Sequence, residues 1–184
     1  MGVRNLIELQ TPLSEKAVRA LRIGDVVSLS GTIITARDRA HQHLFEKGSP
    51  LDLKGGVLYH CGPIINGGTA VSAGPTTSAR LERFEPEIIR RFGIRAIIGK
   101  GGMGKATLAA LKEHGCIYLS AVGGCGALLA KRVERVEGVH FLEEFGAPEA
   151  MWVFQVKHFP TVVTMDSHGN SLHAEVEAKT AGRA

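Results

Sequence analysis

Two short apolar runs, separated by a glycine-rich loop and a helical pattern, limit the fold of this chain most strongly. They cover residues 94–98 and 116–122, and the second is apolar almost throughout. A continuous apolar strand is typical of a parallel sheet that is covered on both faces. Residues 106–114 show the pattern of an amphipathic helix that ends at Gly115. Strand and helix alternate in this way from about residue 57 to residue 135, which predicts βαβ units.

The two ends of the chain depart from this alternation. Strands are predicted at residues 3–10 and 26–34, and helices at 15–21 (capped by Ser14), 36–45 and 124–132. Gly31 predicts a β-bulge or a close backbone contact. Late strands are predicted at 151–157 and 161–165 with a turn at 158–160, followed by a second turn at 166–170 and a polar helix or tail. These extra strands predict an α/β fold with mixed sheet layers rather than a simple doubly wound sheet.

Two glycine-rich loops stand at the centre of the chain, and each leads toward a predicted helix. The first runs from Gly74 to Arg80, and the second from Gly99 to Lys105. Backbone N–H groups at a helix N-terminus bind anions, and the helix dipole strengthens the attraction. Thr76 and Arg80 are four residues apart and therefore share a helix face. Each loop holds a cation, so the pair predicts a clamp for a small anion.

Length and composition exclude several classes of protein. The chain has 184 residues, which predicts one domain over residues 1–184, and its net charge is +4. Lys and Arg are scattered and only 5% of residues are aromatic, so a nucleic-acid surface is disfavoured. The three cysteines lack paired spacing, and no apolar run reaches the length of a membrane span. We therefore expect a cytoplasmic protein that binds neither nucleic acid nor membrane.

Three cations lie where open α/β sheets bind ligands. Arg37, Arg80 and Lys100 each follow a predicted strand or precede a helix. The planar guanidinium group can bind both oxygens of a carboxylate. Several such cations converging would suit a dicarboxylic acid better than a single phosphate.

A nucleotide-binding loop is an alternative interpretation of residues 100–105, because lysine and glycines follow a strand and precede a helix. Ala106 stands where a hydroxyl is needed to bind magnesium, and Thr107 is one place too late. The apolar run that ends at Asp166 could still serve as the second strand of such a site. This alternative predicts magnesium-dependent ATP binding through Lys105.

The histidines and cysteines give no metal-binding pattern. No two of the eight histidines have the helical spacing of a zinc site, and His41 and His43 should point to different sides of their helix. Solvated or capping histidines are the favoured interpretation, and no metal ligand is predicted in this chain. Cys61 and Cys116 suit core packing. His60, beside Cys61 at a strand end, is the histidine for which a role at the site stays open.

At these residues the chain resembles a known family. The segments Gly-Pro-Thr-Thr-Ser-Ala-Arg (74–80) and Gly-Lys-Gly-Gly-Met (99–103) look like those of the β subunit, or C-terminal domain, of class I fumarases and L-tartrate dehydratases. Residues 24–25, 30–41, 62–63, 123–127 and 144–150 also fit, so the likeness covers nearly the whole chain in order. The Tyr-His-Cys sequence at 59–61 departs from the expected tyrosine and small residues, so His60 and Cys61 either tune the pocket or pack.

The resemblance implies a swivelling β/β/α-type fold and an iron–sulfur hydro-lyase acting on a four-carbon dicarboxylate. Fumarate-to-L-malate conversion is expected first, and tartrate-to-oxaloacetate conversion next. It implies a 4Fe-4S cluster held by a partner α subunit, so that this chain alone would be an inactive half of the enzyme in an α2β2 assembly with homodimeric contacts. Arg37, Arg80, Lys100 and Gly101 would bind substrate, and Thr76 would be the acid or base. A stand-alone anion-binding or regulatory domain is the competing interpretation.

Overall fold

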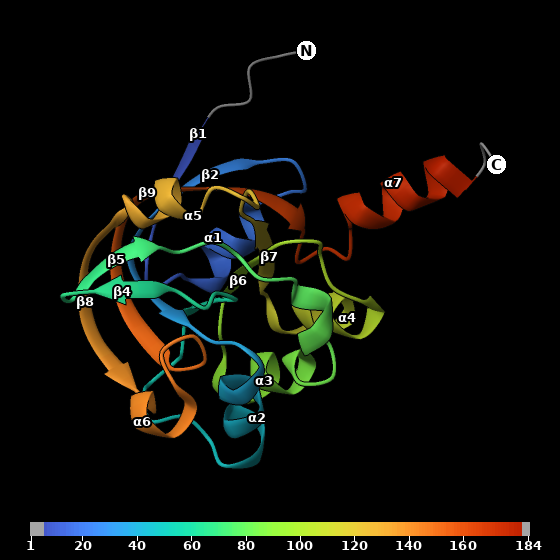
Figure 1. Ribbon diagram of the computed structural model, residues 1–184. Coiled ribbons are helices and arrows are strands. Elements are labelled where there is room, and N and C mark those ends of the chain that lie inside the picture. Colours follow the sequence, from blue (N-terminus) through green and yellow to red (C-terminus); the bar gives the residue numbers. More distant parts are fainter. Residues whose placement is uncertain (1–5, 182–184) are drawn as a thin grey trace.

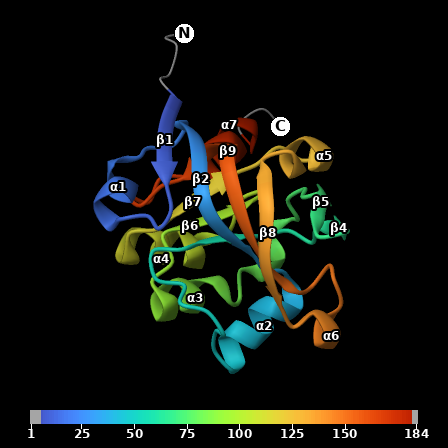
Figure 2. The ribbon, with the colours of Figure 1, turned by 90° about the vertical axis from the view of Figure 1, so that its left-hand side faces the viewer.

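The computed structural model describes residues 6–181, which form a mixed sheet that closes on itself (Figures 1 and 2). Within these residues the strand order is β1-β2-β3-β6-β7-β9-β8, and β2 also pairs with β9. That extra pairing joins β2, β3, β6, β7 and β9 into a barrel-like ring. The strands are β1 (Leu6–Gln10), β2 (Val26–Thr35), β3 (Val57–Tyr59), β4 (Ile64–Asn66), β5 (Thr69–Ser72), β6 (Ala96–Gly99), β7 (Ile117–Ser120), β8 (Val133–His140) and β9 (Met151–Met165).

Helices pack beside this ring, and one of them extends from the body. Figure 1 shows α2, α3 and α4 together on one side, while α7 projects away from the sheet. Among residues 6–181, no helix combines the length and the hydrophobicity that a membrane span requires. The helical elements are α1 (Glu15–Ala20), α2 (Asp38–Glu46), the 3₁₀ turn η1 (Ser78–Leu81), α3 (Glu85–Phe92), α4 (Lys105–His114), α5 (Gly126–Ala130), α6 (Leu142–Phe145) and α7 (Leu172–Ala181).

The parallel strands of the ring are buried on both faces, as their apolar sequences predict. Successive side chains of a strand point to opposite faces. In β6, Ile98 therefore packs in one apolar cluster with residues of β2 and β9, while Ile97 packs in a second cluster with Ile88 of α3 and Leu111 of α4. The pairs β2–β3, β3–β6 and β6–β7 are all parallel. The predicted α/β fold with mixed sheet layers is thus confirmed.

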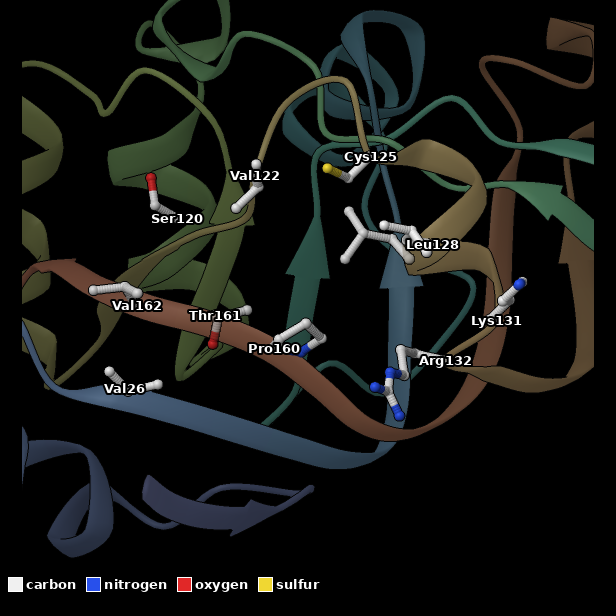
Figure 3. Close-up of a pocket in the computed structure, with 11 residues that line it drawn as sticks. Val26, Ser120, Val122, Cys125, Leu128, Lys131, Arg132, Pro160, Thr161 and Val162 are labelled. Carbon is white, nitrogen blue, oxygen red and sulfur yellow. The ribbon is translucent and has the colours of Figure 1, made fainter. Parts of the chain in front are cut away.

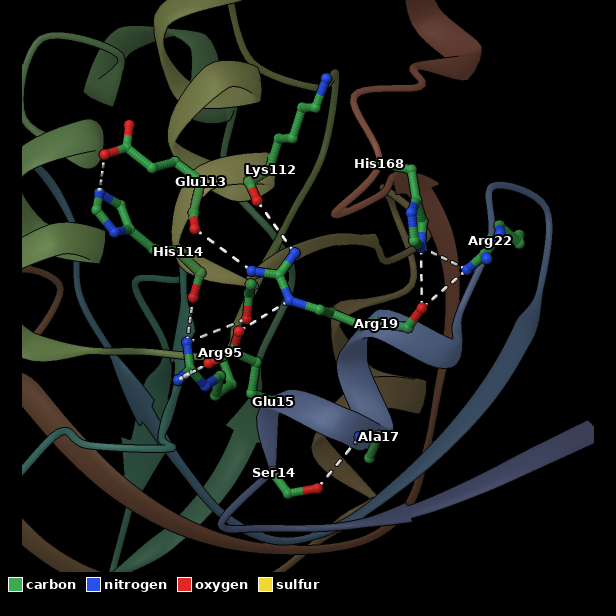
Figure 4. Close-up of polar contacts among 11 residues, drawn as sticks. Ser14, Glu15, Ala17, Arg19, Arg22, Arg95, Lys112, Glu113, His114 and His168 are labelled. Atoms are coloured by element: carbon green, nitrogen blue, oxygen red, sulfur yellow. Dashed lines mark hydrogen bonds and ion pairs between the residues drawn. The ribbon is translucent and has the colours of Figure 1, made fainter.

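The N-terminal segment is fastened to the end of α4 by two arginines (Figure 4). Ser14 accepts a hydrogen bond from the Ala17 amide at 3.1 Å and caps α1, as predicted. Arg19 donates to the carbonyls of Lys112 and Glu113 at 3.1 and 3.3 Å. Arg95 donates to the last carbonyls of α4 and to Glu15. Cations at a helix C-terminus satisfy free carbonyls and complement the helix dipole.

Both features predicted for Gly31, a β-bulge and a close backbone contact, are present in the structure. The register between β2 and β9 shifts between Leu29 and Gly31, which is a β-bulge. Its φ of +102° lies in the left-handed region. A Cβ atom there would overlap the side chain of Thr11, so the backbone also approaches closely. Of the predicted first strand, residues 3–5 lie outside the described part of the chain.

The structure corrects the prediction of two late strands separated by a turn. Residues Met151–Met165 form one strand, and the predicted turn at 158–160 lies inside it. Pro160 has no N–H to donate, but β8 pairs with β9 only as far as Val156, and β7 begins to pair at Val162. Pro160 therefore falls where this edge of β9 has no partner, and a proline is tolerated there.

Four further segments differ from their predicted form. The hairpin β4–β5 and the strand β8 were not predicted from the sequence. The helix expected at 124–132 is the short α5. The segment after Gly74 makes an extended stretch and the turn η1, and the regular helix α3 begins only at Glu85, one residue before Pro86. The polar segment after residue 170 forms the helix α7.

Candidate active site

Four neighbouring parallel strands deliver loops to one edge of the sheet. Strand β2 leads to Arg37, β3 leads to His60, β6 leads to Lys100, and β7 leads to the loop at 121–125. The carboxyl ends of parallel strands lie at the same edge, where α/β folds bind their ligands. The structure therefore places Arg37 and Lys100 at this edge, as the sequence indicated.

The segment before η1 crosses this edge and is bound to it through its backbone. The amide of Thr76 donates to the carbonyl of His60 at 2.7 Å. The amide of Lys100 donates to the carbonyl of Thr76 at 3.2 Å, and the amide of Ser78 donates to the carbonyl of Lys100 at 3.1 Å. Thr76 and Lys100 are thus held side by side although 24 positions separate them in the sequence.

Thr76 and Arg80 are in direct contact. Arg80 Nη2 donates to Thr76 Oγ1 at 3.0 Å, and it also lies 3.0 Å from Asp38 Oδ2 at the start of α2. The Arg80 side chain is 48% exposed, so a ligand can reach it. Because the guanidinium group only donates, the hydroxyl proton of Thr76 stays free to point at a ligand. A positive charge beside this oxygen also stabilises it in deprotonated form.

Arg37 is held apart from that pair by a carboxylate. Its Nε lies 3.3 Å from Glu149 Oε1, and Glu149 also accepts the Arg39 amide at 3.0 Å. Gly62 leaves the room that the guanidinium group occupies, because a Cβ atom there would overlap Arg37. Within residues 6–181, no hydrogen bond or ion pair joins the Arg37 side chain to Thr76, Arg80 or Lys100.

The second glycine-rich loop places Lys100 at the carboxyl end of β6. Gly101 and Gly102 have φ values of +80° and +71°, which side chains rarely adopt. The Lys100 side chain runs against the β7–α5 loop, since a Cβ atom on Gly123 would lie 3.5 Å from Lys100 Cδ. This loop gives Gly101 an exposed backbone position next to Lys100.

The start of α4 is already occupied by a side chain of this protein. Glu82 accepts hydrogen bonds from the amides of Gly104 and Thr107 at 2.7 and 3.0 Å, and from the Thr107 hydroxyl at 2.7 Å. A carboxylate at this helix N-terminus takes the place that a phosphate would need. Asp166 is likewise engaged by amides of its own turn, at His168 and Asn170. Both observations disfavour the nucleotide-binding alternative.

Two of the eight histidines differ from the predicted solvated or capping residues. His41 and His60 are fully buried, and both point Nε2 at Glu85 Oε2, at 2.9 and 3.3 Å. His43 instead contacts Phe141, so the prediction that His41 and His43 face different sides is confirmed. In the described part of the chain, His41, His60 and Glu85 are also the only group close enough to bind a metal ion. Their spacing of 19 and 25 residues gives no local signal.

The cysteines do not gather into a cluster site. Cys61 and Cys116 are buried and Cys125 is half-buried, and all three are free. Burial raises the pKa of the Cys61 thiol to about 12, although Tyr59 and Arg37 act in the opposite direction. A buried neutral thiol packs as a small apolar side chain. These residues do not fit an iron–sulfur cluster, which needs several thiolates at one point.

An apolar cavity is lined by residues of β9 and of the segment 120–132 (Figure 3). Its volume is about 590 Å³. Figure 3 shows Val122 and Leu128 facing Pro160 and Val162 across the cavity, with Arg132 near its rim. It contains none of Arg37, Thr76, Arg80 and Lys100, so the cavity and the candidate site are separate features.

With this geometry established, comparison with known proteins identifies the family. Residues 3–176 match the family model described as the fumarase C-terminus. The chain therefore belongs to the fumarase C-terminal family, which confirms the family resemblance seen in the sequence.

Individual relatives agree with this family. A protein of Geobacillus stearothermophilus, provisionally named class I fumarate hydratase, is 53% identical over 95% of this chain, which spans only 35% of that relative. A protein of Methanocaldococcus jannaschii, provisionally named L(+)-tartrate dehydratase subunit beta, is 48% identical over 91% of each chain. L(+)-tartrate dehydratase subunit beta of Escherichia coli K12 is 42% identical over 91% of this chain and 86% of its own. The predicted class, a hydro-lyase built from two subunits, agrees with these names.

Proposed function

We propose that this chain, as a single domain over residues 1–184, is the β subunit of a cytoplasmic iron–sulfur hydro-lyase acting on a four-carbon dicarboxylate. The main support is the contact between Thr76 and Arg80 at the sheet edge, beside the backbone of Lys100. It places a hydroxyl group next to exposed cations, which is what addition of water to an unsaturated diacid needs. Fumarate and L-malate are the first substrate pair to test, and L-tartrate is the next.

In this proposal the cations bind and orient the substrate. Arg80 and Lys100 bind one carboxylate, assisted by the Gly101 backbone, and Arg37 binds the other after exchanging Glu149 for substrate. The exposed Arg80–Asp38 pair can exchange in the same way, because surface ion pairs have small net free energies. Fixed orientation of a substrate accounts for much of the rate increase in enzymes.

Thr76 is the proposed acid or base of this chain. During dehydration, the Thr76 oxygen would act as an alkoxide stabilised by Arg80, and it would accept the proton from the carbon next to the departing hydroxyl group to become a neutral hydroxyl group. During hydration the same oxygen would return the proton to carbon. The 4Fe-4S cluster would be held by the partner α subunit, because the cysteines of this chain do not fit it. When bound, such a cluster supplies a Lewis acid for the departing hydroxyl group.

Reconstitution tests this proposal. Fumarate–malate interconversion is measured without oxygen, first with this chain alone and then with an α subunit carrying an intact cluster. Activity is expected only in the mixture, with an α2β2 mass. Lys100→Ala should abolish turnover without preventing subunit pairing, whereas Lys105→Ala, in the same loop, should keep near-normal turnover. If the mixture with an intact cluster shows no activity on fumarate, malate or tartrate, a non-catalytic, anion-binding or regulatory domain would be favoured instead.

A further inference from the structure

A chain of buried polar groups runs directly beneath the candidate site. Its first part joins α2, α3 and the end of β3 through His41, Glu85 and His60, all of which are fully buried. His41 Nδ1 lies 2.8 Å from the carbonyl oxygen of Arg37. His41 Nε2 lies 2.9 Å from Glu85 Oε2, and His60 Nε2 lies 3.3 Å from the same oxygen.

The second part joins His60 to the two glycine loops. His60 Nδ1 lies 2.8 Å from Ser78 Oγ, and Ser78 Oγ lies 2.8 Å from the hydroxyl oxygen of Tyr118. The Gly102 amide donates to that same hydroxyl oxygen. Gly99 leaves the space that these side chains occupy, because a Cβ atom there would overlap both Ser78 and Tyr118.

The hydrogen bonds of this buried network can be assigned in one consistent direction, from Gly102 toward His60. The Gly102 amide can only donate, so Tyr118 accepts from it and donates its own proton to Ser78. Ser78 then donates to His60 Nδ1, which leaves the His60 proton on Nε2, toward Glu85. Burial lowers the pKa of His60 more than neighbouring Glu85 raises it, so His60 is neutral. Its contact with Glu85, at 3.3 Å, is not aligned as a hydrogen bond.

The other end of this network, at His41, fixes the position of a second proton. The Arg37 carbonyl can only accept, so His41 carries a proton on Nδ1. A further proton lies between His41 Nε2 and the carboxylate, which makes this a buried imidazolium–carboxylate pair. Burial would raise the pKa of Glu85, but the neighbouring His41 outweighs burial and lowers that pKa. Glu85 thus binds His41 by a hydrogen bond and lies 3.3 Å from His60, so that the two parts of the network meet at its carboxylate.

This network touches each of the three segments that bear the candidate site. It ends on the backbone of Arg37, it contains Ser78 between Thr76 and Arg80, and it binds Gly102 two residues after Lys100. We propose that His60, Ser78 and Tyr118 are positioning residues that hold these three segments as one unit. The role assigned to them in substrate binding rests on the proposed function, whereas the coupling of the segments is a property of this chain alone.

A matched pair of tyrosine variants tests the coupling. Tyr118→Phe removes one hydroxyl group from the network. Tyr59→Phe removes an equally buried hydroxyl group on β3, which is separated from β7 by β6; this hydroxyl donates to the carbonyl of Ala73 and contacts Cys61. In ¹⁵N-labelled full-length protein, wild-type His60 is expected to carry its proton on Nε2 alone and His41 to carry protons on both nitrogens.

Tyr118→Phe should shift the Nδ1 resonance of His60 and the amide resonances of residues 76–80 and 100–102, while Tyr59→Phe should leave both sets unchanged. A His60 proton on Nδ1 in the wild type, or equal effects of the two variants, would overturn the proposal. A stoichiometric metal ion found by elemental analysis would also overturn it, because His41, His60 and Glu85 would then be metal ligands.

Kinetics of the reconstituted enzyme test the role of this network in substrate binding. Tyr118→Phe is expected to raise the KM for the dicarboxylate roughly tenfold while kcat changes little, because loosened cations bind the substrate less well. An unchanged KM with shifted resonances would confine the network to a structural role and contradict its part in substrate binding. If the enzyme is silent with every diacid while the resonances behave as expected, the proposed function fails and the coupling of the segments stands.

Discussion

Two ion pairs of this protein lie near each other in the fold and differ in almost every physical respect. Arg80 and Asp38 meet at the surface, where both side chains are nearly half exposed. His41 and Glu85 meet in the core, where both are fully buried. Surface pairs have net free energies of about 0–1 kcal/mol, whereas breaking a buried pair by removing one partner costs about 3–5 kcal/mol. The exposed pair can therefore exchange partners with a ligand, and the buried pair can hold a fixed geometry.

The largest expected effect comes from breaking the buried pair. Glu85→Gln leaves the His41 charge without a counter-ion in the core, so the free energy of unfolding should fall by about 3–5 kcal/mol. Glu87→Gln is a matched control on the same helix, because Glu87 pairs with Arg90 in solvent. Urea denaturation measures both variants. Equal decreases in the free energy of unfolding would show that the buried pair stabilises the fold no more than the exposed pair.

The pH dependence of stability should report the same network. The pKa of Glu85 is lowered to about 2 and the pKa of His60 is lowered by burial, so the unfolded chain binds more protons than the folded one. The free energy of unfolding should therefore fall as the pH drops below about 6.5, and fall again between about 4.5 and 2. Glu85→Gln should weaken the lower of these two phases, to which the lowered pKa of Asp166 also contributes. Stability that stays constant from pH 7 to pH 3 would contradict the assignment.

The capping carboxylate of α4 is expected to have an intermediate effect. Glu82→Ala removes three hydrogen bonds from the start of α4, so stability should fall by about 1–2 kcal/mol. Glu113→Ala, near the other end of the same helix, should change stability by less than about 0.5 kcal/mol. If Glu82→Ala gained magnesium-dependent ATP binding, the loop would be a blocked nucleotide site, and its assignment to dicarboxylate binding would fail.

The smallest effect on stability is expected at the exposed pair. Asp38→Asn removes the competitor for Arg80, so stability should change by no more than about 0.5 kcal/mol. In the reconstituted enzyme the KM for the dicarboxylate should fall roughly two- to fivefold, because the Arg80 guanidinium is freed for substrate. A rise in KM would show that Asp38 fixes Arg80 in place instead of exchanging with the ligand.

The sequence predicted those parts of the site that depend on neighbouring positions in the chain. Thr76 and Arg80 are four residues apart and are in contact, although they meet across the 3₁₀ turn η1 and do not share the helix face that the sequence predicted. Lys100 follows a short apolar strand, and that strand is β6. The end of a parallel strand is recognisable in the sequence because apolar residues give way to glycine and charge.

Other parts of the site were not predictable because their partners are distant in sequence. His41 and Glu85 are 44 residues apart, and Ser78 and Tyr118 are 40 apart, so no periodic pattern joins them. Glu85 lies before a proline at the start of a helix, a place where acids are common for local reasons. The single strand β9 was missed for a related reason: the gap between its pairing with β8 and its pairing with β7, where Pro160 lies, cannot be seen in the sequence.

The most direct test compares two arginines in the reconstituted enzyme. Arg80 contacts Thr76 at the candidate site, whereas Arg90 is exposed on α3 and pairs with Glu87. Steady-state fumarate–malate kinetics without oxygen should show kcat/KM reduced by about a hundredfold or more in Arg80→Ala, as when a charge-stabilising group is lost. Arg90→Ala should stay within about twofold of the wild type. Near-normal kcat/KM in Arg80→Ala, with subunit pairing intact, would contradict the account.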